Sequence, residues 1–287
     1  MIRSVRFENF RCLREVELPL EPLTVLVGPQ ASGKTAVLDG LDFQPGCDVK
    51  DYWRQEETGR PVVEWRYENG RRMRVEYPLR ALDSTPMQGH TLQALALDLA
   101  AMREEGRGGR SPVLNRTGDN LSEVFAALPP EARQRVVEEL CRLVPTVGGV
   151  ELREGKGRTQ RLRFRDAWRE DLWISPDRVG DTVLVLLAYL VLPYQRPPPD
   201  VLTVDMPERG LPPWLLGDVM AWLRGMTTGK LGGEPVQVVL ATSSPELLEH
   251  VSPEEVRVFS REPEDGSVRV SASPEDVADW RQRLAMM

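Results

Sequence analysis

The chain has 287 residues, 41% of them hydrophobic and 28% charged, which suffices for one large domain or for a domain with a subdomain. Its formal net charge of -7 argues against a whole-chain clamp on nucleic acid, so such a contact would need a local basic stripe or a partner. Three separated cysteines (Cys12, Cys47 and Cys141) and two histidines argue against a disulfide framework and a zinc site. The polar N-terminus and short apolar runs predict neither a signal peptide nor a membrane span, and we expect a cytoplasmic protein.

The first quarter of the chain reads as β-structure interrupted by one helix. Alternating apolar and polar residues predict an antiparallel strand pair, followed by a buried strand that ends at Gly28 and a helix from about Ser32. Residues 62–77 form two alternating runs joined by Asn69-Gly70, a strong hairpin signal because both residue types tolerate positive φ. This hairpin should belong to a β-rich arm.

Residues 91–143 are expected to be mostly helical, with helices over 91–105, from Asn120 and from Pro130. A glycine-broken turn at 147–149, a second hairpin through 150–166 and a core helix from Gly180 should follow. Strand and helix then alternate from 200 to 251, the rhythm of a parallel sheet, and a hairpin through Asp265-Gly266 closes the chain.

The run "GPQASGKT" has the spacing of a phosphate-binding loop, between a predicted strand and a predicted helix. Its backbone N–H groups would cradle phosphates at a helix N-terminus, the lysine would reach the outer phosphates, and the threonine hydroxyl would ligate Mg²⁺. The sequence therefore predicts binding of ATP with Mg²⁺ by eight residues: Gly28, Pro29, Gln30, Ala31, Ser32, Gly33, Lys34 and Thr35.

A phosphate loop needs an acidic Mg²⁺ partner at the end of a neighbouring strand. The segment "DVLTVDMPE" supplies an apolar strand with Asp205 at its C-terminal end. We therefore expect Thr35 and Asp205 to form the metal site.

With both motifs placed, the chain resembles the ABC-type, AAA-family ATPases of the RecF and SMC-like group, in particular the short proteins related to overcoming-lysogenization-defect ATPases. The resemblance rests on "MIRSVRFENFRCLREVELPLEPLTVLVGPQASGKT", "GDNLSEVFAAL", "VDMPERGLPP" and "VQVVLATSSPELLEHV". It implies an α/β ATPase head with a mixed sheet, an antiparallel β arm and an inserted helical lobe. The expected divisions are an N-terminal lobe over 1–82, a helical subdomain over 83–145 and a C-terminal lobe over 146–287.

The departures from the family pattern fall on its catalytic positions. Met206 stands where the resemblance implies a water-polarising Glu, and a thioether cannot accept a proton. Ser243 stands at the γ-phosphate-sensing His, and Gly180 at the signature serine, beside the matching Asp181. Loss of a positioned base typically costs 10²- to 10⁴-fold in rate. An alternative alignment, in which Ser175 replaces the signature serine and Glu208 serves as base, stays open.

Several arginines are candidates for contacts with nucleic acid, an acidic partner or the nucleotide. Arg161, Arg163 and Arg165 alternate with apolar residues on one strand face, and with Arg66, Arg72 and Arg74 they would form a basic stripe for nucleic acid or an acidic partner. The alternative is a solvated face paired with local carboxylates. Arg11 is expected near the nucleotide, as the corresponding family arginine can be.

The function expected from these features is an ATP-binding subunit whose nucleotide-dependent dimerisation or assembly regulates a protein effector. Hydrolysis would be weak or partner-dependent, with Asp205 and Glu208 as the catalytic candidates. The resemblance implies homo- or hetero-oligomers through the nucleotide face, in antiphage defence or DNA maintenance. The alternative is a catalytically inactive scaffold that uses nucleotide only structurally; a metabolic kinase fits poorly because no acceptor-site and lid set follows the loop.

Overall fold

The computed structural model describes residues 1–42, 59–76, 90–104, 111–154, 160–272 and 274–285. The tip of the second hairpin, the boundary at 82/83 and Cys47 lie outside the described residues. The chain forms two compact units, one of residues 1–94, 199–207 and 237–287 and the other of residues 95–198 and 208–236. These units do not follow the three predicted divisions, which stay predictions.

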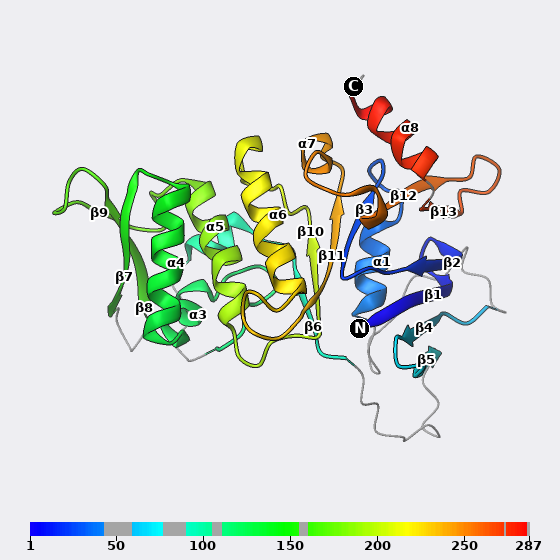
Figure 1. The fold of residues 1–287 in the computed structure, drawn as a ribbon, viewed down its shortest axis with the longest axis horizontal. Coiled ribbons are helices and arrows are strands. Elements are labelled where there is room, and N and C mark those ends of the chain that lie inside the picture. Colours follow the sequence, from blue (N-terminus) through cyan, green and yellow to red (C-terminus); the bar gives the residue numbers. More distant parts are fainter. Residues whose placement is uncertain (43–58, 77–89, 105–110, 155–159, 273, 286–287) are drawn as a thin grey trace. The chain divides into compact units, whose positions relative to one another are not determined.

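The first unit is built on a six-stranded sheet with the order β13-β12-β3-β11-β10-β6 (Figure 1). The neighbouring pairs β10–β11, β11–β3 and β3–β12 are parallel, and β13 pairs antiparallel with β12 in a hairpin. The strands are β3 (Leu23–Val27), β6 (Leu92–Leu95), β10 (Val201–Asp205), β11 (Gln237–Thr242), β12 (Val256–Arg261) and β13 (Val268–Ser271). Its helices are α1 (Lys34–Leu41), α7 (Pro245–Leu248) and α8 (Pro274–Ala285), with a 3₁₀ turn at Pro253–Glu255.

An antiparallel β arm completes this unit. It has the order β2-β1-β4-β5 and consists of β1 (Ile2–Phe10), β2 (Leu13–Pro19), β4 (Val62–Tyr67) and β5 (Arg72–Glu76). Its buried face carries Phe7 and Trp65, both fully buried in one cluster with Val37 and Leu41 of α1. The arm therefore packs against the helix that follows the phosphate loop. In the β4–β5 turn Gly70 takes a positive φ of 79°, whereas Asn69 does not.

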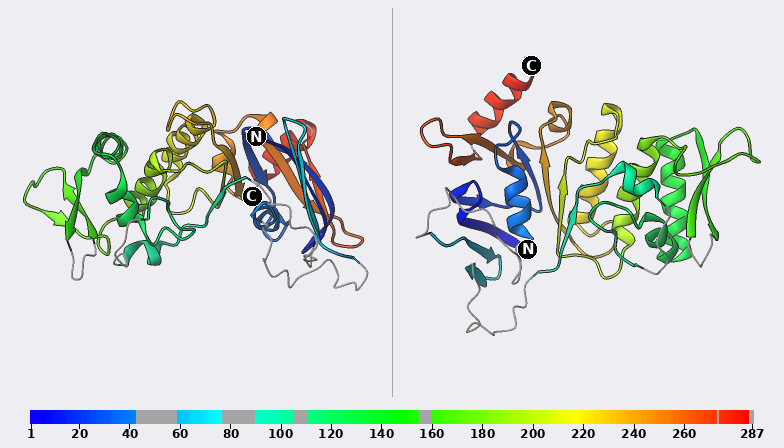
Figure 2. Two further views of the ribbon diagram at one scale, coloured as in Figure 1. Left: turned by 90° about the horizontal axis from the view of Figure 1, so that it is seen from below. Right: turned by 180° about the vertical axis from the view of Figure 1, so that it is seen from behind.

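The second unit combines helices with a three-stranded antiparallel sheet of order β7-β8-β9. Helix α5 is buried on all sides, as its apolar sequence requires, and packs against α4 and α6 (Figure 2). The elements are α2 (Leu99–Arg103), α3 (Leu121–Ala127), α4 (Pro130–Leu143), β7 (Val147–Glu154), β8 (Gln160–Asp166), β9 (Trp173–Ile174), α5 (Asp181–Val191), a 3₁₀ turn (Leu192–Tyr194) and α6 (Pro213–Thr227).

The helix predicted over 91–105 is wrong in its first half. Residues 92–95 form strand β6, and only residues 99–103 are helical. Gln93, Leu95 and Leu97 are buried while their neighbours are partly exposed, a period of two that an alanine- and leucine-rich composition hides. Residues 147–149, expected as a turn, begin β7 with a register shift instead, and α8 was not predicted. Within the described residues no helix has both the length and the apolar character needed to cross a membrane.

Candidate nucleotide-binding site

The strand order brings the predicted site segments to one edge of the six-stranded sheet. Strand β11 lies between β3 and β10, with Thr242 in register with Val27 and Ala241 in register with Asp205. The phosphate loop after β3, Asp205 at the end of β10 and Ser243 after β11 therefore meet at the carboxyl ends of parallel strands. This is the usual location of ligand sites in such sheets.

The phosphate loop leaves no room for side chains at its two glycines. A Cβ on Gly28 would lie 2.5 Å from Phe259 O, and one on Gly33 would lie 2.8 Å from a methyl group of Val268. Gly33 also has a φ of 104°, which favours glycine. Both contacts are with the β12–β13 hairpin, so this distant hairpin packs directly against the loop. The outer residues Pro29, Gln30 and Ala31 are exposed, whereas Ser32 is buried.

Lys34 folds back across the loop. Its Nζ donates to Gly28 O at 2.7 Å and to Pro29 O at 2.8 Å, with Ser32 Oγ at 3.4 Å. The ammonium group is thus already held over the turn whose N–H groups would face a phosphate.

Thr35 and Asp205 are brought together although 170 residues separate them. Thr35 Oγ1 donates to Asp205 Oδ2 at 3.1 Å, at the start of α1. A hydroxyl and a carboxylate are the hard oxygen donors that Mg²⁺ accepts, usually completed by nucleotide phosphates and water. Among the described residues no cluster of three or more His, Cys, Asp or Glu could hold a metal by itself.

Met206 follows this carboxylate in a conformation unusual for its residue type. Its φ is 53°, its side chain is 42% exposed, and its N–H donates to Ala241 O at 2.8 Å. A left-handed conformation at a bulky residue costs of order 1 kcal/mol and tends to mark functional positions. The backbone at this point is therefore specialised while the side chain carries no acid–base group.

Ser243 is exposed directly after β11. The next residue, Ser244, begins α7: its Oγ accepts from Leu247 N at 3.3 Å, the geometry of an N-cap. The serine at 244 therefore serves as the N-cap of α7. At position 243 the chain presents a hydroxyl and not an imidazole.

Arg261, at the end of β12, is a further residue of the site that the sequence did not predict. Its Nε and Nη2 donate to Ala31 O at 3.0 and 2.8 Å, and its Nη1 donates to Gly266 O at 2.7 Å. Ala31 has a φ of 58°. The guanidinium therefore clamps the tip of the phosphate loop to the closing hairpin. No sequence signal marks this contact, because 230 residues separate the partners.

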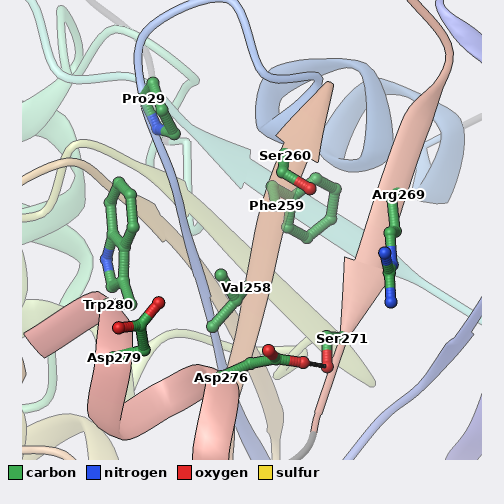
Figure 3. A pocket seen from close by; sticks show the side chains of 9 residues that line it. All are labelled: Pro29, Val258, Phe259, Ser260, Arg269, Ser271, Asp276, Asp279 and Trp280. Atoms are coloured by element: carbon green, nitrogen blue, oxygen red, sulfur yellow. Dashed lines mark hydrogen bonds between the residues drawn. The ribbon is translucent and has the colours of Figure 1, made fainter. Parts of the chain in front are cut away.

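A pocket of about 230 Å³ lies beside the loop, between the β12–β13 hairpin and α8 (Figure 3). Pro29 forms one side, Trp280 of α8 stands near it, and Asp276 accepts from Ser271 Oγ (Figure 3). The pocket depends on α8, which the sequence did not predict.

Arg11, in the β1–β2 turn, is held against α1. It forms an ion pair with Asp39, one helical turn beyond Thr35, and its guanidinium lies 5.8 Å from the ring of Phe10. The structure thus brings Arg11 to the helix of the phosphate loop, and its contact with nucleotide stays a prediction.

The remaining candidates belong to the second unit. Gly180 is the N-cap of α5, where a helix start was predicted, and Asp181 forms an ion pair with Arg103; the signature role of this segment stays a prediction. Ser175 instead donates to Asp177 in the preceding turn, which lowers the pKa of that carboxyl. Glu208 lies near Tyr189, whose pKa is raised first by complete burial and then by the Glu208 charge. A catalytic role of Glu208 stays a prediction.

The comparisons agree with this geometry. Residues 1–44 match the model of the AAA ATPase domain family. Over 53 residues the chain is 43% identical to the OLD nuclease of Thermus scotoductus, a match that spans 18% of this chain and 9% of that protein. The family resemblance is confirmed.

Solved structures extend the likeness to the whole chain at the level of the fold. An SMC head bound to the C-terminal winged-helix domain of ScpA superposes with a TM-score of 0.61 and 14% identity, covering 94% of this chain and 97% of that one. An Smc head with an extended coiled coil, bound to the C-terminal domain of ScpA from Pyrococcus furiosus, gives 0.58 and 12%, covering 99% of both chains. The expected fold, an α/β ABC-type ATPase head, is also confirmed.

Proposed function

We propose that this protein is a nucleotide-dependent switch: it binds ATP with Mg²⁺ and assembles with a second copy or a related head, and this assembly regulates a protein effector. The observation that carries the proposal is the intact loop, with Lys34 over the turn and Thr35 bonded to Asp205. When bound, ATP would supply the charge and the phosphate oxygens that complete this site.

The residues around the loop support slow or partner-dependent hydrolysis. Lys34 and the loop N–H groups would neutralise and orient the outer phosphates, and Thr35 and Asp205 would hold Mg²⁺. Met206 provides no base to orient water, and Ser243 provides no imidazole. A partner chain would therefore have to supply the missing groups, or turnover would stay low.

An effector partner is supported by the two SMC heads, which were solved bound to ScpA domains. The antiphage or DNA-maintenance setting rests on the likeness to OLD nuclease over a short segment. A DNA setting would require a nucleic-acid contact, for which Arg161, Arg163 and Arg165 are the candidates. A catalytically inactive scaffold is the second candidate function, favoured by Met206 at the end of β10.

Three measurements on the pure protein test the proposal: equilibrium binding of ATP with Mg²⁺, steady-state ATPase turnover, and assembly state with and without ATP. We expect wild type to bind ATP, to turn it over slowly, and to lose binding in Lys34→Ala. Lys230→Ala serves as a matched control, because this lysine lies in the α6–β11 connection of the other unit.

The outcomes separate the alternatives. Binding without turnover, with no change of assembly state, would favour the scaffold. Fast turnover that Glu208→Ala abolishes would contradict the slow-hydrolysis reading. If wild type fails to bind ATP, both functions are wrong.

A further inference from the structure

The β7-β8-β9 sheet concentrates positive charge that the chain as a whole lacks. On β8, Leu162 and Phe164 are 3% and 1% exposed, so the alternate residues face away from the core of the unit. Directly paired residues share a face, and the register Gly149–Arg165–Trp173, Glu151–Arg163 and Arg153–Arg161 defines what we call the arginine face. Its members are Gly149, Glu151, Arg153, Arg161, Arg163, Arg165 and Trp173.

The charge of the arginine face is opposite to that of the chain. Four arginines and one glutamate give it a net charge of +3, against -7 for all 287 residues. Glu151 lies 3.7 Å from Arg163, and Arg165 donates to Gly148 O at 2.6 Å, which holds two of the guanidinium groups in place. Arg153 and Arg161 are exposed.

In the β arm, by contrast, arginines are paired with carboxylates. Arg66 bonds to Glu64 and to Glu17, both at 2.8 Å, and Arg74 lies within 4 Å of Glu64 and Glu8. There the carboxylates of neighbouring strands neutralise Arg66 and Arg74, whereas on the arginine face the arginines outnumber the carboxylates. Its excess charge is therefore a local property of that sheet.

Aromatic rings accompany the arginines. The guanidinium of Arg163 lies 5.1 Å from the ring centroid of the half-buried Trp173. In the β8–β9 turn Trp168 is 75% exposed, and Asp166 Oδ1 accepts from the backbone N–H of Trp168 at 2.9 Å, so the turn presents this indole to solvent. Exposed aromatic rings beside positive charge are the usual platform for unstacked bases, and arginine adds cation–π contacts.

We propose that the arginine face binds single-stranded nucleic acid, with Arg153, Arg161 and Arg163 on the phosphates and with bases stacked on Trp168 and Trp173. Single strands fit better than duplex because only unpaired bases expose the flat faces that indoles stack on. The site lies wholly within the second unit and does not depend on the nucleotide site.

The test is fluorescence anisotropy of a labelled oligothymidylate of about 20 nucleotides with the full chain, without ATP. Single strands follow a slope of about -0.7 per neutralised phosphate in log K against log salt. Arg161→Ala/Arg163→Ala should therefore make the slope shallower by about 1.4. Trp168→Ala should weaken binding roughly 5- to 150-fold without a change in slope, because loss of one stacked base costs about 1–3 kcal/mol.

The matched control is Arg72→Ala/Arg74→Ala, which removes the same charge from β5 and should leave oligothymidylate binding as in wild type. ATP binding, measured on every variant, separates failure of this site from failure of the nucleotide site. The proposal is overturned if wild type does not bind the oligonucleotide at low salt, or if both double variants weaken binding equally. It is also overturned if a duplex binds as tightly and Trp168→Ala has no effect, or if polyglutamate competes as well as oligothymidylate does.

Discussion

The phosphate loop and the ends of β10 and β11 lie at the same edge of one sheet, yet the loop is held by many more contacts than the strand ends. The loop is fixed from several sides: Lys34 bonds to its carbonyls, Arg261 holds Ala31 O, and Gly28 fits against Phe259 with no space for a methyl group. Beyond the bond from Thr35 to Asp205, the strand ends present the exposed side chains of Met206 and Ser243. The residues that would bind the phosphates and the residues that would assist hydrolysis are therefore distinct parts of a single site.

Breaking the loop should have the largest effect. Gly28→Ala places a Cβ 2.5 Å from a backbone oxygen that cannot rotate away, so the loop must shift and lose N–H donors to phosphate. We expect ATP affinity to fall on the order of 100-fold, equivalent to roughly 3 kcal/mol. Isothermal titration calorimetry measures this. Gly149→Ala, where the nearest atom is 3.6 Å away on a side chain, is the control, and an unchanged affinity in Gly28→Ala would refute the close-packing argument.

Placing a base at position 206 should change the strand ends and leave the loop intact, and it should raise ATP turnover. Met206→Glu places a carboxylate after Asp205, and positioned bases contribute 10²- to 10⁴-fold, so a gain of at least about 10-fold in turnover is expected. Met206→Gln has the same shape without basicity and should stay at the wild-type rate. Equal turnover in all three proteins would mean that hydrolysis is limited elsewhere.

Loosening the clamp at the loop tip should have a moderate effect. Arg261→Ala removes two bonds to Ala31 O, and at an exposed position we expect a cost of about 1 kcal/mol, or roughly 5-fold in ATP affinity. Arg269→Ala, which removes an exposed arginine from the paired strand β13, should bind ATP like wild type. If Arg261→Ala loses less ATP affinity than this control does, the bonds from Arg261 to Ala31 O do not contribute to ATP binding.

The smallest expected effect is a pH dependence centred on His90. Its Nδ1 lies within hydrogen-bond distance of Tyr67 Oη, at 2.9 Å, its Nε2 lies 3.4 Å from Leu41 O at the end of α1, and burial lowers its pKa. The unfolded chain therefore takes up the proton first, so stability is lost as the pH falls below about 6.5 towards the folded pKa. Urea unfolding at a series of pH values should show this slope in wild type and a flatter profile in His90→Gln. Identical profiles would remove His90 as the cause.

Much of the fold could be predicted because its signals are local. Alternation located the paired strands of the arm, and apolar strands followed by helices indicated the parallel sheet. The errors arose where local signals compete: residues 92–95 have helix-forming composition, but pairing at a sheet edge makes them a strand. Helix α8 is mostly polar in sequence, and its packing against β12 of the closing hairpin is a tertiary contact that local signals do not show.

By itself the sequence determined the chemistry available at the site: a loop of Gly28, Gly33, Lys34 and Thr35, an Asp at a strand end, and side chains without acid–base function at 206 and 243. Residue identity and short-range spacing suffice for that. Only the tertiary structure decided that Thr35 bonds to Asp205, that Arg261 clamps Ala31, and that four arginines share one face of the β7-β8-β9 sheet. Strand order and register bring together residues separated by 170 and by 230 positions, and that information is spread over the packing of the whole chain.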